Sequence, residues 1–450
     1  MNSRPLNYDS LKVVLEYLEP NIRFQLSIRC PSIRQTEKLV PLKLDFLQFQ
    51  KYFIRINQTG YLLRVEKESS DGAILSEEDR LLCHDLDEYG VSEQCIPDVI
   101  TPGDIDLGRI PWGPSDETEL YYEWNLRIFE KALEIRNQEN SEPFIGPYKR
   151  ESWIEMLEWP EGLNEEQEEA LKREYIETLV HYPSKNLLVT IEGFREFLEP
   201  YFRRRDKIPP PFTMKLELSV DHPKGEHRIR YPYTIKLQEA AKRLNTFFFG
   251  DRPMIHTNCF CVRQTDFVIP LPVGFKIKSR RWDISAHNTL FFESLKTIFD
   301  DASFPLEVIH LNGVQIEEEF EHEIIRNTKF LIIRPCFPIQ YILNLLLLLN
   351  TRNTRIRVLT FWDDQALVEQ QLDEIQFFID NPIKIGTSVS FGIKTMESIN
   401  RFAGIVNERI LVLPLDENRR LEFECRKSLY PSTHRKFDLT MTVVAIETNE

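Results

Sequence analysis

The sequence predicts a mixed protein of the α+β or α/β class, built from several parts. Apolar residues near the start of the chain recur at helical spacing, and strand-like and helix-like segments alternate over the last third. Between them, residues 61–180 hold 11 Lys and Arg against 31 Asp and Glu. A chain of 450 residues with 42% hydrophobic residues can bury two to four cores at roughly 100–200 residues per domain.

Residues 1–45 are expected to form a small helical unit. Leu6, Leu11, Val14, Leu15 and Leu18 follow the spacing of one helix face, with Asn7 or Asp9 as its N-cap. Proline is favoured at the first position of a helix, so Pro20 and Pro31 predict a second and a third short helix.

Residues 46–118 are expected to hold short strands followed by an acidic loop. Segments 42–47, 52–56 and 61–65 read as strands, the last two paired across a turn at 57–60. Residues 66–118 are acidic and rich in Pro and Gly, which predicts a long, partly disordered linker.

Residues 119–208 form the predicted helical acidic segment. Amphipathic helices are expected over 119–138, 164–180 and 192–203. The run Pro209-Pro210-Pro211 is expected to be a semi-rigid boundary after this segment.

Residues 209–450 are expected to form an α/β domain with leucine-rich-repeat-like character. Alternation predicts a strand over 212–220, a helix over 235–245, strands near 254–262, 267–271 and 275–278, and a helix over 288–299. Strands near 306–311, 330–333, 356–361 and 389–391 alternate with helical stretches over 316–324, 339–349 and 365–378. Their spacing of about 20 to 30 residues is typical of leucine-rich-type repeats, and an ordinary α/β sheet is the alternative. Segments 410–413, 421–425 and 437–443 predict an antiparallel cap.

The sequence carries no motif that indicates an enzyme or a cofactor. No glycine-rich phosphate loop, nucleophile elbow or zinc-protease motif is present, so we expect no catalytic residue and no bound cofactor. His256-x-x-Cys259-x-Cys261 comes nearest to a metal site, but without a second ligand pair buried thiols are the better interpretation. The net charge of −15 argues against nucleic acid as a partner.

Two short basic patches stand out against this acidic background. They are Arg203-Arg204-Arg205-Asp206-Lys207 and Lys276-x-Lys278-x-Arg280-Arg281. Either could contact an acidic partner or the acidic segment of the chain itself, with a solvated surface as the default interpretation.

Compartment and membrane association follow from what the chain lacks. Residues 1–10 show no apolar signal segment, and the longest apolar run, 343–349, is too short to cross a membrane. Seven scattered cysteines fit free thiols in a reducing compartment. We therefore expect a cytoplasmic or nuclear protein with no membrane contact.

The segment from Pro5 to Ile33 resembles a divergent F-box. The resemblance rests on Pro5-Leu6, Leu11, Val14-Leu15, Tyr17-Leu18, Arg23-Phe24, Leu26 and Cys30-Pro31, although the Trp that usually follows the Cys of an F-box is absent. An F-box is a helical unit that docks on a Skp-type adaptor of a cullin-type ubiquitin ligase, by helix-in-groove recognition. The resemblance implies adaptor binding through Leu11, Val14, Leu15, Leu18, Phe24 and Leu26.

A second resemblance extends over nearly the whole chain. TPGDIDLG at 101–108, PPPFTMKLEL at 209–218, EAAKRLNTFFFG at 239–250, LPVGFKIK at 271–278 and FPLEVIHLN at 304–312 follow the F-box-like start. Together they are similar to a family expanded in Caenorhabditis nematodes, of the domain of unknown function 3557 type. Nematode F-box proteins of this layout imply that the C-terminal region selects an unknown protein target, and the family supplies no catalytic residue.

Two hypotheses follow for a non-enzymatic protein. In the first, residues 5–40 bind a Skp-type adaptor and the α/β repeats present a surface to a target protein. In the second, the N-terminal helices are an integral cap of a scaffold with no ligase partner. An enzyme is the third and least supported alternative, since it would require a pocket of converging titratable groups.

Overall fold

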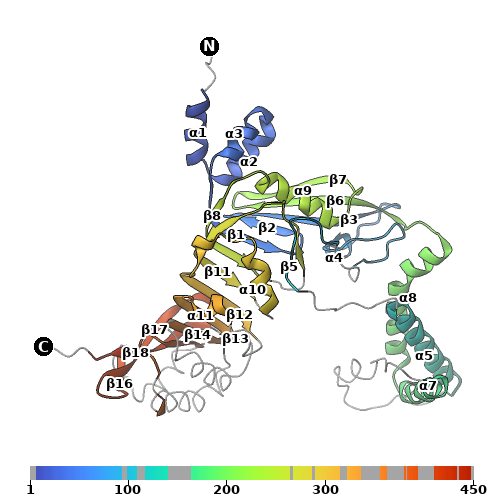
Figure 1. The fold of residues 1–450 in the computed structure, drawn as a ribbon. Helices are drawn as coiled ribbons and strands as arrows, with labels where there is room; N and C mark the ends of the chain where they lie inside the picture. Colours follow the sequence, from blue (N-terminus) through green and yellow to red (C-terminus); the bar gives the residue numbers. More distant parts are fainter. Residues whose placement is uncertain are drawn as a thin grey trace.

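The fold is that of a computed structural model, shown in Figure 1. It describes residues 7–93, 99–108, 117–139, 164–263, 267–285, 289–314, 322–335, 355–361, 380–381, 383–393, 410–432 and 435–446.

The chain begins with a small helical unit, as expected. It comprises α1 (Tyr8–Tyr17), α2 (Pro20–Arg29), the 3-10 turn η1 (Pro31–Ile33) and α3 (Arg34–Leu39). The Asn7 side chain caps α1 by accepting from the Ser10 amide at 2.8 Å, and Pro20 occupies the first turn of α2. Local helix signals in the sequence therefore set the limits of this unit.

One large mixed sheet runs through the described part of the molecule. Its antiparallel section contains β1 (Leu42–Gln50), β2 (Phe53–Ile56), β3 (Thr59–Ser69), β6 (Phe212–His222) and β7 (Gly225–Pro232). The predicted pairing of the second and third strands is confirmed, with Ile56 opposite Thr59. The edge strand β7 was not predicted, because its residues are polar or exposed on both faces.

The parallel section joins the antiparallel one where β1 pairs with β8 (Ile255–Val262). From β8 the order continues through β11 (Arg281–Ile284), β12 (Val308–Val314), β13 (Phe330–Pro335), β14 (Arg355–Phe361) and β15 (Ser388–Ile393). The short strand β10 (Ile277–Ser279) also pairs with β8. The expected antiparallel end is confirmed as β16 (Ile410–Pro414), β17 (Arg419–Ser432) and β18 (Arg435–Ala445), with β18 paired to β15.

Helices cover one face of the parallel section, which we call the inner face. Rings from α9 (Leu237–Phe249) and α10 (Thr289–Lys296) share one hydrophobic core with inner-face residues of the strands. Phe49 lies 6.2 Å from Phe249, and Phe260 lies 6.3 Å from Trp282, measured between ring centroids. Of the helices predicted between the last strands, the structure describes only α11 (Glu323–Arg326); the stretches 339–349 and 365–378 lie outside the described residues.

The expected acidic linker is largely built into the body where it is described. Residues 66–108 contain the end of β3, α4 (Glu77–Arg80), β4 (Leu81–Leu82) and β5 (Ile105–Asp106), which pairs with β9 (Val268–Ile269). Leu86 and Leu107 are buried, and Asp85 accepts from the Leu237 amide at the start of α9. In the described ranges of this segment, carboxylates and apolar side chains therefore both find partners in the body.

The acidic segment forms a separate helical layer with its own core. It consists of α5 (Glu117–Glu139), α7 (Glu165–Leu179) and α8 (Ser184–Asp206), and in Figure 1 it stands beside the sheet. The basic run at the end of α8 contacts the acidic segment itself, since Arg204 and Arg205 pair with Glu119 and Glu123. No helix in the described ranges is long and apolar enough to span a bilayer.

Candidate functional site

The six predicted adaptor-binding residues divide between the interior and the surface. Leu15 and Phe24 are buried, at 0% and 2% exposure, and Phe24 packs its ring 4.8 Å from that of Phe248. Val14 is 42% exposed, whereas Leu11, Leu18 and Leu26 are half-buried. Leu15 and Phe24 are therefore unavailable to a partner in this conformation, because the chain's own body covers them.

A buried ion pair network fixes the helical unit to the rest of the chain. The Glu37 carboxylate accepts from Arg23 Nε at 2.9 Å and from Arg252 Nη2, which follows α9, at 2.5 Å. All three side chains are at most 2% exposed. Burial lowers the pKa of Arg23, Glu37 opposes this shift, and Arg252 adds to it. Both guanidinium groups also donate to backbone carbonyls, so the network holds α2, α3 and α9 together.

Apolar side chains nevertheless reach solvent on the outside of these helices. Val13 is 57% exposed, Tyr17 86% and Ile28 60%. We call Val13, Val14, Tyr17, Ile22 and Ile28 the N-terminal apolar surface. Exposed apolar side chains that adjoin one another, as those of residues 13, 14 and 17 do by helical spacing, are typical of a contact site for another protein.

Three of the segments that carry the family resemblance meet at one point. Asp104 of segment 101–108 accepts from Lys242 Nζ on α9 at 2.5 Å and from the Leu271 amide at 3.2 Å. Lys242 also donates to the carbonyls of Pro102 and Leu271. Because its ammonium has three acceptors, Lys242 is held as a structural cation and not as a free nucleophile.

Gly103 is required by the same junction. Its φ of +95° favours glycine, and a Cβ there would stand 2.7 Å from the Leu271 carbonyl oxygen. The motif residues Gly103 and Asp104 therefore join loop, helix and strand.

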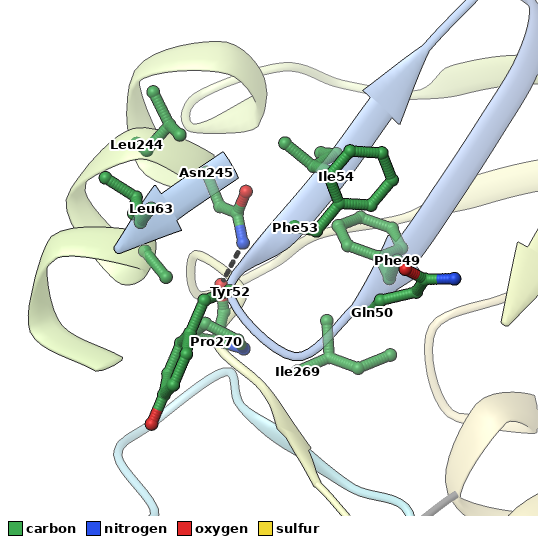
Figure 2. A pocket seen from close by; sticks show the side chains of 11 residues that line it. Phe49, Gln50, Tyr52, Phe53, Ile54, Leu63, Leu244, Asn245, Ile269 and Pro270 are labelled. Carbon is green, nitrogen blue, oxygen red and sulfur yellow. Dashed lines mark hydrogen bonds between the residues drawn. The ribbon is translucent and has the colours of Figure 1, made fainter. Parts of the chain in front are cut away.

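The cavity drawn in Figure 2 lies between the β1–β2 turn, α9 and the segment after β9. It is lined mainly by apolar side chains, and Asn245 Nδ2 donates to the Pro270 carbonyl at 2.7 Å. Its volume is about 10 Å³, which holds one water at most. The cavity is too small for a substrate or cofactor.

Polar side chains line up across the sheet on the face opposite α9 and α10, which we call the outer face. Strand register places Gln48, Cys261, Asp283 and His310 side by side on β1, β8, β11 and β12. Asp283 accepts from Arg263 at 3.1 Å and from Asn312 at 2.7 Å. The sheet thus gathers a thiol, a carboxylate and an imidazole from three parallel strands.

The order of these groups does not suit nucleophilic catalysis. A cysteine nucleophile needs a base or cation beside it, and here the carboxylate of Asp283 stands between the thiol and His310. Burial and the charge of Asp283 raise the pKa of Cys261 to about 12 and that of Cys259 to about 11. Both thiols stay protonated near neutral pH, so this row supplies no thiolate.

The raised pKa values of the two thiols also bear on His256-x-x-Cys259-x-Cys261, the segment that comes nearest to a metal site. His256 is exposed, Cys261 is buried, and the part of the chain that the structure describes contains no group of three potential metal ligands close together. Protonated thiols are also poor ligands.

Sequence reasoning did not bring Arg263, Asp283, His310 and Asn312 together. Arg263, Asp283 and His310 are 20 and 27 residues apart in sequence, and only the parallel register of β8, β11 and β12 makes them neighbours. The available signal was the polar residue that alternates with buried apolar ones in each strand.

A comparison with protein families places part of the chain in a known domain type. Residues 236–395 match the family model described as "Domain of unknown function (DUF3557)", so this region is a domain of that type. The match begins at α9 and ends just after β15, and it does not include the F-box-like helices. No curated protein and no solved structure matches the chain.

Proposed function

Taking residues 236–395 as a DUF3557-type domain, we propose that the protein is a non-enzymatic, cytoplasmic or nuclear interaction protein that acts as an F-box-like substrate adaptor of a cullin-type ubiquitin ligase. The N-terminal helices would bind a Skp-type adaptor, and the α/β region would bind an unidentified target protein. The observation that carries the proposal is the N-terminal apolar surface, which no part of the described chain covers.

The contact residues differ from those that the F-box resemblance implies. Leu15 and Phe24 stabilise the unit from inside, so we assign adaptor binding to Val13, Val14 and Tyr17. Residues 13 and 17 are one helical turn apart on α1, with residue 14 beside them, and such a row can enter a groove on a partner.

The order of the parallel strands supports a leucine-rich-repeat-like arrangement of the target-binding part. The strands β8, β11, β12, β13, β14 and β15 start 22 to 33 residues apart and lie beside one another in chain order. Each unit then buries its apolar face against the next one and leaves its outer-face positions free to vary.

A pull-down with a purified Skp-type adaptor tests the ligase role. The double variant Val14→Asp, Tyr17→Asp changes exposed side chains only, so it should unfold like the wild type yet lose adaptor binding. The matched control is Leu188→Asp, Val189→Asp on α8, where the replaced residues are 46% and 61% exposed. This control should retain adaptor binding.

The alternative is a scaffold protein with no ligase partner. The burial of Leu15 and Phe24 and the Arg23–Glu37–Arg252 network favour it, because they make the helices an integral part of the body. If the wild-type chain captures no Skp-type adaptor, the ligase role is wrong and the scaffold alternative stands.

A further inference from the structure

The strand β7 is an edge strand, and one side of its backbone has no strand partner in the described part of the chain. Its other side pairs with β6, and the order of the sheet ends at β7. Six of its eight residues are exposed and two are half-buried. Figure 1 shows β7 at the border of the sheet. Such an edge presents N–H and C=O groups to which another strand can add.

The register of two hairpins determines which backbone groups of β7 point outward. Turns of two residues join β2 to β3 and β6 to β7. In hairpins of this kind the closing residue pair exchanges hydrogen bonds, and bonded pairs then alternate along the strands. Counting from either turn gives the same result, because the odd-numbered residues of β7 bond to β6. Glu226, Arg228 and Arg230 therefore direct their N–H and C=O groups away from the sheet.

A second copy of β7 can use all of these outward groups in one antiparallel register. If Arg228 opposes Arg228 of the second copy about a two-fold axis, Glu226 opposes Arg230 twice, and three residue pairs exchange backbone hydrogen bonds. A slip of two residues in one direction places Pro232, which has no N–H, opposite Glu226. A slip in the other direction places Lys224 of the turn opposite Arg230. The strand is thus most complementary to itself in the first register.

The charged side chains of β7 fit this register. Charged edge strands resist pairing when like charges meet, but here Glu226 would face Arg230 across the strand pair. Within the described residues Arg230 donates to Glu66 through Nε and Nη2, so its Nη1 remains for a second carboxylate. The two Arg228 side chains meet at the axis, and each is compensated by Glu226 of its own chain at 3.0 Å and by Glu77 at 3.3 Å.

The opposite face of β7 also fits a second copy. Tyr231 is 46% exposed, and in this register it opposes Gly225, where a side chain would meet no atom within 4 Å. The ring can therefore lie over the glycine, an arrangement that stabilises glycine in edge strands. Ile229, which neighbours Leu218 on β6, would face His227 of the second copy.

We propose that two copies of this chain associate through β7, so that their sheets join around a two-fold axis. The contact between residues 226 and 230 of each copy is small, and we expect a weak dimer with a dissociation constant on the order of 10 µM. The inference does not depend on the ligase role. In that role, however, the dimer would carry two N-terminal apolar surfaces.

Sedimentation velocity on the full chain, from about 1 to about 200 µM, tests the proposal. The variants are Glu226→Arg and Arg230→Glu, studied singly and as an equimolar mixture. Each single variant sets like charges against each other twice, whereas the mixture restores two opposite-charge pairs. The matched controls are Lys185→Glu and Glu192→Arg at exposed positions of α8. Thermal unfolding of every variant shows that it is folded.

We expect the wild type and both controls to dimerise alike, each single variant to lose about tenfold in affinity, and the mixture to recover it. A wild type that stays monomeric at about 200 µM would overturn the proposal, as would single variants that dimerise like the wild type or a mixture as weak as its components. Adaptor capture is measured on the same samples. A dimer without capture refutes the ligase role alone, whereas capture by a monomeric chain refutes this inference alone.

Discussion

Replacing Glu37 by glutamine should detach the N-terminal helical unit from the sheet. Glutamine has the size of glutamate but no charge, so Arg23 and Arg252 would remain buried, at 2% and 1% side-chain exposure, without a counter-ion. Removal of one partner from a buried ion pair costs about 3–5 kcal/mol, and here one carboxylate serves two arginines. We therefore expect the free energy of unfolding to fall by an amount near the upper end of that range.

Two measurements check this prediction. Urea unfolding gives the loss of stability, and hydrogen exchange at the amides of α2 and α3 shows whether this unit opens first. The matched control is Glu16→Gln, because Glu16 pairs with Lys43 at 2.9 Å but both side chains are exposed. An exposed pair contributes about 0–1 kcal/mol, so the control should unfold like the wild type. If Glu37→Gln costs no more than Glu16→Gln, the network does not anchor the unit and the reasoning is wrong.

Three further predictions follow from the described contacts. Gly103→Ala should destabilise the protein by about 1–3 kcal/mol more than Gly72→Ala in thermal unfolding, since both glycines have positive φ but only the Cβ at 103 would meet backbone atoms; equal losses would refute the contact. Burial and the neighbouring Lys67 and Lys51 lower the pKa of His84 from 6.5 to about 4, so the unfolded chain takes up this proton at a higher pH than the folded one. The contribution of neutral His84 to the free energy of unfolding is complete above pH 6.5, and it falls by up to about 3 kcal/mol as the pH drops through 4. Urea titrations at these two pH values should show a smaller loss of stability for a His84→Asn variant than for the wild type. Iodoacetamide at pH 8 should alkylate the exposed Cys30 well before Cys259 and Cys261, whose pKa values are about 11 and 12; mass spectrometry that finds Cys261 modified first would contradict the raised pKa.

Local patterns in the sequence predicted most elements of the fold that the structure describes. Alternation found β6, helical spacing found α5 and α8, and prolines placed the starts of α2 and η1. For the acidic loop, composition does not reveal that Asp85 and Asp104 are buried acceptors for α9 and Lys242. Acidic residues next to Pro and Gly predict solvent exposure unless a distant donor is known.

The candidate sites depended on information that no single segment contains. The periodicity of α1 and α2 groups apolar residues on each helix, but it cannot tell which of them meet a partner and which meet the chain itself. Phe24 illustrates this limit, since it packs against Phe248, more than 200 residues later in the chain. The row of Cys261, Asp283 and His310 depends on the register between parallel strands, which is likewise set by distant residues.

In the proposed role, the Arg23–Glu37–Arg252 network would fix the position of the N-terminal apolar surface relative to the outer face of the sheet. An adaptor that positions a target for a ligase must hold its two binding surfaces at a fixed separation. Glu37 joins the helices of the N-terminal apolar surface to Arg252, three residues before β8 begins, and β8 starts the parallel section that bears the outer face. The two surfaces are thus connected through one buried ion pair network and one strand, without a hinge segment between Arg252 and the sheet. In the Glu37→Gln variant we therefore expect both surfaces to keep their separate partners while target and adaptor are no longer held at one fixed distance. Fluorescence energy transfer between a dye attached to the parallel section and a labelled Skp-type adaptor should then report a broader distribution of distances. An unchanged, narrow distance distribution in that variant would show that some other contact sets the geometry.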